Sequence, residues 1–335
     1  MLEKIKISVS KSTYDILIKD CENFNFLKSS NELNKNLFLN TLIVNYYEKF
    51  SAEKETFKEK LLKVINEHVD ENQLELLDKI INTISKEEND DANKKSEVIN
   101  LKPTKLSEKD ILFIENNLIG NNSISSYYRN LFTSYAHIPQ NYREQIIFKD
   151  IYETLLDSIN KERKVCLTLK NNDVINKVSV YKIESSKEEL FNYVLINNDH
   201  FSMTLRLSKI KYVTLLNEKR YITDKSATMF NKQIFYGVQH PFYRHNEESV
   251  VVKMSERGKE MFKKIYIYRP VPEKIENDLY YFNCSHAQIT YYFKRFGADA
   301  MIIYPIELTE KMKSYYFKAG KKYNQLLNNE KKGTN

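Results

Sequence analysis

The first residues of the chain alternate between apolar and polar side chains. Over residues 4–10, Ile5, Ile7 and Val9 alternate with Lys and Ser. A period of two predicts a strand with one apolar face and one cationic, hydrogen-bonding face. A lone strand cannot bury its apolar face, so the pattern also predicts a partner strand.

Two amphipathic helices are predicted directly behind this strand. The first covers residues 12–24 and the second residues 34–50. In the second helix, apolar side chains recur at i, i+3, i+4 and i+7, which predicts one inward-facing stripe. Residues 51–97 are predicted to be a charged helical segment that ends in a polar linker, 86–97.

Residues 98–136 repeat this order of elements, with a short strand followed by a helix, a turn and a second helix. When the second helices of the two segments are aligned, Leu42 falls on Leu131 and Tyr46 falls on Tyr135. We interpret the two segments as an internal repeat. Two unrelated helical hairpins are the alternative.

The second half of the chain has a different pattern. Residues 137–163 are predicted to be a helical connector, and β-branched and aromatic runs broken by polar turns then predict several strands up to residue 221. We expect residues 222–245 to be irregular. Beyond them, strand-like runs, "KIYIYR" (264–269) among them, surround a predicted helix at 285–296. The fold class is therefore predicted to be α+β.

A strand followed by two helices, with basic and polar residues alternating on the strand, resembles the ribbon-helix-helix module. In that family two strands pair as an antiparallel ribbon whose outer face enters the DNA major groove. The resemblance implies one unit at residues 1–50 and a possible second unit at 98–136. The partner strand is then either the strand near residue 100 or the same strand of a second protomer.

Residues 164–225 resemble the WYL domain, an Sm-like small β-barrel of bacterial regulators. The resemblance is carried by "VSVYKI", "FNYVLI" and "TLRLSKIKYV", in which the name-giving triplet reads Asn192-Tyr193-Val194. Residues 248–330 resemble the C-terminal domain that follows many WYL domains. WYL proteins of this type are found in clostridia and ruminococci, some of them beside type VI-D CRISPR effectors.

Composition adds a mild bias toward an anionic partner. The formal net charge is +7, and the 24 Tyr and 18 Phe offer flat surfaces on which nucleic-acid bases can stack. A Lys-rich and Asn-rich composition typical of AT-rich genomes is an equally good explanation of the charge.

Catalytic, metal and membrane functions find little support in the sequence. It contains no GxSxG, Walker or HExxH motif, and its three cysteines are far apart, so we expect no enzyme, no metal and no cofactor. Without a signal peptide or an apolar run of about 18 residues, we expect a cytoplasmic protein that does not contact the membrane.

The candidate nucleic-acid-binding residues of the N-terminal region have two origins. Some lie on the outer face of the expected ribbon and can reach base edges, although a solvated edge is the alternative. Others begin the second helices and can offer N–H groups to phosphate, although ordinary N-capping is equally probable on the sequence. The two sets are Lys4, Lys6, Ser8, Asn100 and Lys102, and Asn34, Lys35, Asn36, Ser123 and Ser125.

A second candidate site follows from the WYL resemblance, which implies a nucleic-acid or nucleotide-like ligand at one mouth of the barrel. Arg206 stands at the family's basic position with no obvious acidic partner, which favours an external anion. Barrel packing is the alternative for the tyrosines. The candidate residues are Tyr181, Tyr193, His200, Arg206 and Lys209.

These features predict a nucleic-acid-binding regulator and a homodimer. The first hypothesis is a transcriptional regulator that grips duplex DNA through the ribbon and senses a ligand through the WYL barrel. The alternative is a CRISPR-associated accessory protein that binds single-stranded RNA or DNA through the WYL domain. A scaffold without nucleic-acid affinity is a third possibility.

Overall fold

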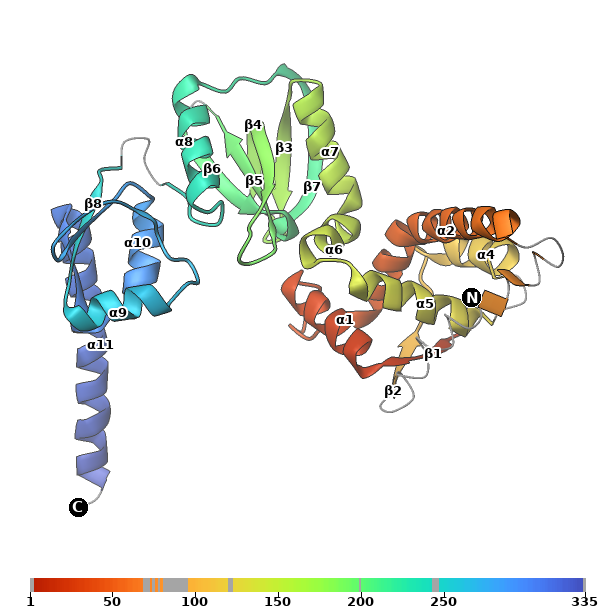
Figure 1. The fold of residues 1–335 in the computed structure, drawn as a ribbon, viewed down its shortest axis with the longest axis horizontal. Helices are drawn as coiled ribbons and strands as arrows, with labels where there is room; N and C mark the ends of the chain where they lie inside the picture. The colour runs from red at the N-terminus through yellow and green to blue at the C-terminus, as the bar shows by residue number, and fades with distance from the viewer. Residues whose placement is uncertain are drawn as a thin grey trace. The chain divides into compact units, whose positions relative to one another are not determined.

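The computed structural model describes residues 3–68, 96–119, 123–198, 200–242 and 247–333, together with residues 73, 76, 77, 79 and 80. The chain is an α+β protein with antiparallel sheets (Figure 1). It forms two compact units, Met1–Glu153 (unit 1) and Thr154–Asn335 (unit 2). Among the described residues, no helix is both long and apolar enough to cross a membrane.

Unit 1 contains two copies of a strand followed by two helices, as the repeat predicted. Ser10 ends the first strand and caps the helix behind it by accepting a hydrogen bond from the Thr13 N–H, at 3.1 Å. The elements are β1 (Ile5–Ser10), α1 (Lys11–Asn23), α2 (Lys35–His68), β2 (Ser96–Leu101), α4 (Glu108–Asn117), α5 (Ile124–His137) and α6 (Gln140–Ile147). Helix α7 (Lys149–Asn160) begins in unit 1 and ends in unit 2.

The predicted antiparallel pairing of the two strands is confirmed, and it occurs within one chain. β1 and β2 form a two-stranded sheet in which Ile7 lies opposite Ile99 and Lys6 lies opposite Asn100. Ile7 and Ile99 are buried while Lys6 and Asn100 are exposed. The apolar strand faces therefore cover the helices, and the polar faces point to solvent.

The aligned residues of the two repeats meet in the core of unit 1. Leu42, Tyr46, Leu131 and Tyr135 are all fully buried. The rings of Tyr46 and Tyr135 pack edge to face, and the Tyr46 hydroxyl shares a hydrogen bond of 2.9 Å with the Ser134 hydroxyl. The interior is thus built from equivalent positions of α2 and α5.

Helix α2 runs further than the sequence predicted, to His68 rather than residue 50. The expected linker at 86–97 lies outside the described residues up to residue 95, and Ser96 and Glu97 already belong to β2.

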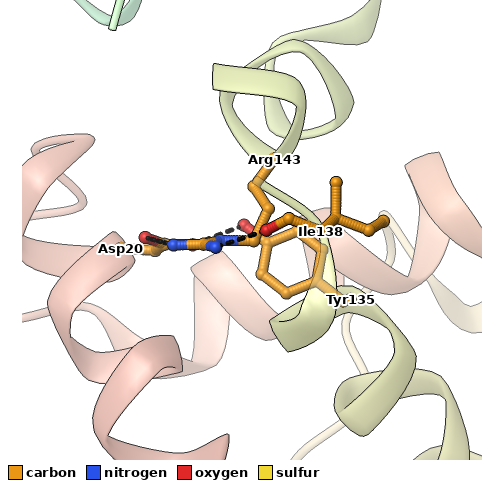
Figure 2. A network of polar contacts seen from close by, with 4 residues as sticks. All are labelled: Asp20, Tyr135, Ile138 and Arg143. Atoms are coloured by element: carbon orange, nitrogen blue, oxygen red, sulfur yellow. Dashed lines mark hydrogen bonds and ion pairs between the residues drawn. The ribbon is translucent and has the colours of Figure 1, made fainter. Parts of the chain in front are cut away.

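A buried ion pair fastens α6 to α1 (Figure 2). Arg143 donates from Nε and Nη2 to the two carboxylate oxygens of Asp20, at 2.6 and 2.9 Å. The Tyr135 hydroxyl donates to the same carboxylate, at 2.9 Å, and Arg143 also donates to the Ile138 carbonyl, at 2.5 Å. Burial raises the pKa of Tyr135 well above its usual value, so the phenol stays a donor.

Unit 2 begins with a five-stranded antiparallel sheet in the order β6-β5-β4-β3-β7. Its two edge strands follow each other in the chain and are joined by a single 3-10 turn, η2 (Leu207–Lys209). The strands are β3 (Arg163–Leu169), β4 (Val174–Ser185), β5 (Asn192–Asn197), β6 (Ser202–Arg206) and β7 (Ile210–Lys219).

The prediction that residues 222–245 are irregular was wrong for the first part of that segment. Helix α8 (Asp224–Tyr236) starts behind Thr223, whose side chain accepts from the Ser226 N–H, and it buries Met229 and Phe230. These two side chains pack with Tyr193 and Leu195 of the sheet. A short apolar stripe between polar residues was enough for a helix because the sheet supplies the surface on which it packs.

A second antiparallel sheet, in the order β11-β8-β10-β9, completes unit 2. The predicted strand at 264–269 is absent, because α9 reaches Lys264 and a loop follows it. The elements are β8 (Val250–Met254), α9 (Glu256–Lys264), β9 (Pro272–Glu276), β10 (Leu279–Phe282), α10 (His286–Phe293), η3 (Gly297–Asp299), β11 (Ala300–Tyr304) and α11 (Ile306–Gly333).

Candidate nucleic-acid interface

The positive charge of the chain is concentrated in unit 2. Unit 1 contains 21 Lys and Arg against 25 Asp and Glu, a formal charge of −4, whereas unit 2 contains 31 against 20, a formal charge of +11. Contacts with phosphates supply most of the affinity of proteins for nucleic acids. Of the two units, unit 2 is therefore the one whose net positive charge could interact with a polyanion.

The outer face of the ribbon carries the residues that the sequence placed there. Lys4, Lys6, Asn100 and Lys102 are exposed, and Ser8 is half-buried. Lys6 and Asn100 are cross-strand neighbours and so share this face. A small, polar and weakly cationic surface of this kind can offer donors to base edges.

At the start of α2, the three candidate side chains already have partners within unit 1. Asn34 accepts from the Leu37 N–H, at 3.2 Å, and so caps the helix. Lys35 donates to the Tyr14 hydroxyl, at 3.1 Å. Asn36 donates to the Lys102 carbonyl and accepts from the Lys102 N–H, at 3.0 and 2.9 Å.

The start of α5 is engaged in the same way. Ser123 caps the helix by accepting from the Ser126 N–H, at 3.2 Å. Ser125 donates to the Lys6 carbonyl, at 2.9 Å, and Arg129, one turn further on, donates to the Ser8 carbonyl, at 2.7 Å. These side chains hold the strands, and a role in binding phosphate stays a prediction.

In unit 2 the structure places two of the candidate residues side by side. Tyr193 of β5 lies directly opposite Arg206 of β6. Among the described residues, the Arg206 side chain has no hydrogen bond or ion pair, and its Nε and Nη2 atoms are buried. The role of Arg206 in binding an external anion stays a prediction.

Phe191 is the residue that the sequence reasoning missed. The Arg206 Cζ atom lies 3.3 Å from the centroid of the Phe191 ring, so the guanidinium rests on the aromatic face. Phe191 lies just before β5, two positions before Tyr193, and packs against the same buried cluster as Tyr193. This spacing of two positions was the signal in the sequence that could have identified Phe191 as a neighbour of Arg206.

Tyr181, on β4, packs on helix α8 rather than on Arg206. Its ring stacks on Phe230 with centroids 5.3 Å apart, and its hydroxyl donates to Asn231, at 2.8 Å. Phe191 and Tyr181 are both packed against the buried cluster between the sheet and α8, to which Tyr193 belongs. Tyr181 is thus on the same side of the sheet, with a packing role.

His200 and Lys209 are not gathered with Arg206. His200 lies in the turn between β5 and β6, at the closed end of the hairpin, whereas Tyr193 and Arg206 form its last pair at the open end. Four steps of about 3.3 Å separate the Tyr193–Arg206 pair from the Asn197–Ser202 pair next to the turn. Lys209 ends the 3-10 turn and is exposed.

The turn before β5 links Tyr193 to the C-terminal part of unit 2. Glu189 accepts hydrogen bonds from the hydroxyls of Tyr193 and Tyr268. The ring of His240 packs edge to face on Tyr268, with centroids 5.3 Å apart. Burial lowers the pKa of His240 to about 4, partly opposed by the charge of Glu189, so the imidazole is neutral near pH 7.

Comparisons with known proteins give a full-length structural relative. No protein-family model matches the sequence, and no curated protein matches it. A solved structure described as a CRISPR Cas-related protein aligns with a TM-score of 0.66 and 20% identity, covering 97% of this chain and 95% of that chain. Proteasome accessory factor B/C of Arthrobacter aurescens aligns at 13% identity over 65% of this chain and 37% of its own, with a TM-score of 0.25. The chain therefore shares its fold, over nearly its whole length, with a CRISPR Cas-related protein.

Proposed function

We propose that this protein binds single-stranded nucleic acid through unit 2, as a CRISPR-associated accessory protein or a related regulator. The proposal rests on one observation above all: the Arg206 guanidinium lies on the face of Phe191 and, among the described residues, its buried N–H groups have no acceptor. A buried N–H of a charged group that lacks an acceptor is costly, which makes an external anion the natural partner.

The chemistry around Arg206 suits a nucleotide. A guanidinium can bind a phosphate through two N–H groups and can stack on a base through its other face. Phe191 supplies the aromatic face beneath the guanidinium, while Tyr193, opposite Arg206, is buried and packs in the core. The net charge of +11 on unit 2 supports a polymeric anion rather than a single small one.

The sheet order supports an Sm-like barrel of WYL type as the scaffold. β6 and β7 are the two edges of the sheet, and the three residues of η2 join them directly. A single turn between two edge strands keeps the edges close, as closure into a small barrel requires. The residues of the WYL resemblance lie on β4, on β5 and the residue before it, and on the run from β6 through η2 into β7.

The test compares the binding of a labelled 12-nucleotide single-stranded RNA by the full chain and by Arg206→Met, using fluorescence anisotropy at several salt concentrations. Methionine keeps much of the apolar bulk but removes the donors. We expect the affinity to fall at least tenfold, with a melting temperature that is unchanged or higher. An unchanged affinity would show that Arg206 does not bind the RNA.

Arg257→Met is the matched control, because it removes the same charge from the same unit. The Arg257 side chain, on α9, is 79% exposed, and its Nε atom lies 3.6 Å from the Asp299 Oδ2 atom. Loss of a generic positive charge there should change the affinity less than twofold at physiological salt. Equal losses in both variants would mean that binding depends only on net charge.

Duplex DNA is a second candidate ligand, and the ribbon supports it. One chain supplies both strands, and their outer face exposes Lys4, Lys6 and Asn100. If the ribbon binds duplex DNA, the double variant Lys4→Ala/Lys6→Ala should flatten the slope of log K against log salt by about 2. Lys28→Ala/Lys58→Ala removes two charges from the same unit and is the control. Equal slopes in both double variants would exclude the outer face of the ribbon as the duplex-binding surface.

A further inference from the structure

The two outer edges of the ribbon are treated differently by the helices. In an antiparallel pair, alternate residues turn both N–H and C=O toward the partner strand, and the residues between turn both away from it. The Lys6 and Ser8 carbonyls are taken by α5, so these residues turn away from β2. Their cross-strand partners Asn100 and Val98 must then turn their backbone groups away from β1.

The edge of β1 is closed, because Ser125 and Arg129 occupy it. The aligned positions of α2 are Asn36 and Asn40, which point to the other edge. Both of these side chains bind the Lys102 backbone, at the end of β2. Among the described residues, nothing is hydrogen-bonded to the outward N–H and C=O groups of Val98 and Asn100.

The Asn36 amide already imitates an added strand at one position. It donates to the Lys102 carbonyl and accepts from the Lys102 N–H, as the backbone of a neighbouring strand would. Lys102, Asn100 and Val98 alternate along the chain and so present their backbone groups on the same edge. The next two positions for a paired strand are therefore those of Asn100 and Val98.

A pocket of about 250 Å³ lies beside this edge, between β2 and helices α1 and α2. Its walls are mostly apolar, with Leu17, Ile18, Phe38 and Leu39 among the lining residues. This volume suits one or two apolar side chains. Lys35 also lines the pocket and, among the described residues, is not paired with a carboxylate.

We propose that the free edge of β2 is a docking site for an extended segment of another protein, which pairs with Val98 and Asn100 by strand addition. Backbone groups that can form four hydrogen bonds favour an extended peptide over a helix or a compact ligand. The pocket receives an apolar side chain of that peptide, and Lys35 favours a neighbouring acidic residue. This surface is independent of the nucleic-acid site proposed for unit 2.

The test uses backbone amide exchange of the full chain, read at single residues by mass spectrometry. In the free protein, the Val98 and Asn100 amides should exchange quickly, and those of Ile7 and Ile99 slowly. The probe is an acetylated and amidated six-residue peptide that alternates valine with threonine and glutamate. At millimolar concentration it should slow exchange at Val98 and Asn100 at least tenfold.

Two controls make the result specific. The same peptide, N-methylated at alternate residues, keeps its side chains but loses the donors, and it should bind at least tenfold more weakly. Val98→Pro should abolish binding, since proline removes an outward N–H and is tolerated at a strand edge, while Val98→Thr should retain it. Slow exchange at Ile7 and Ile99 in both variants verifies that the ribbon is folded.

Three results would overturn the proposal. Slow exchange of the Val98 and Asn100 amides in the free protein would mean that the edge is already covered. Equal binding of the methylated peptide would show that the pocket captures side chains without strand pairing. No protection at millimolar peptide would show that the edge does not accept a strand.

Discussion

Tyr46 and Tyr135 pack edge to face, with ring centroids 6.1 Å apart, at equivalent positions of the two repeats in unit 1. Both side chains are fully buried. Each ring therefore fills space that the other repeat creates, and the two halves form one core instead of two.

Tyr46→Ala should destabilise unit 1 by about 3–5 kcal/mol, because it removes a buried aromatic ring and leaves a cavity. Tyr46→Phe removes only the hydrogen bond with Ser134 and should cost about 1 kcal/mol. Both free energies of unfolding are measured by amide exchange in α5 over a series of urea concentrations. Tyr142→Ala, at a position 54% exposed, is the control and should change stability by about 0.5 kcal/mol or less.

Arg143→Ala should cost about 3–5 kcal/mol, because it leaves the fully buried Asp20 carboxylate without its charged partner. The double variant Asp20→Leu/Arg143→Met removes both charges and should be more stable than Arg143→Ala alone. Urea midpoints of the wild type, Asp20→Leu, Arg143→Met and the double variant give the coupling. Additive effects would contradict a direct ion pair.

Asn36→Asp should weaken the hold of α2 on the end of β2. The carboxylate can still accept from the Lys102 N–H, but its second oxygen then faces the Lys102 carbonyl without a proton between them. We expect the stability of unit 1 to fall by about 1–3 kcal/mol, measured by amide exchange in β2. Asn34→Asp keeps its capping acceptor for the Leu37 N–H and should be nearly neutral.

His240 should make unit 2 less stable as the pH falls below about 6.5. The pKa of His240 is about 4 in the folded chain, against 6.5 for an ordinary histidine, so the unfolded chain takes up the proton first. The contribution is complete above pH 6.5 and disappears as the pH falls through 4. By the linkage relation it amounts to roughly 3 kcal/mol. His240→Gln should flatten the pH dependence of the melting temperature in this window; an unchanged slope would assign the dependence to other groups.

The ribbon could be predicted from the sequence because its cause is local. Alternation at Ile5, Ile7 and Val9 requires a buried face, and the second copy near residue 100 supplies the partner. The register, with Ile7 opposite Ile99, could not be predicted, since it depends on how α2 and α5 pack. The roles of Asn36 and Ser125 depend on the same packing, so N-terminal polarity alone could not distinguish a strand anchor from a phosphate contact.

The charge distribution, by contrast, was available from the sequence once the chain was divided. A single total of +7 hides an acidic unit 1 and a strongly basic unit 2. For the candidate site around Arg206, the strand pattern was sufficient to predict a guanidinium with no acidic partner on the neighbouring strands. It was not sufficient to place His200, because only the hairpin register shows that this residue lies at the opposite end from Arg206.

Because β1 and β2 belong to one polypeptide, ribbon formation is unimolecular. Dilution cannot separate strands that are covalently tethered, so the ribbon should persist at nanomolar protein, where a ribbon assembled from two subunits would dissociate. Subunit exchange cannot mix its two strands either. The two halves of the outer face can therefore differ: Lys6 precedes the central Ile7 of β1, whereas Val98 precedes the central Ile99 of β2. If the ribbon reads a duplex, that duplex need not be a palindrome.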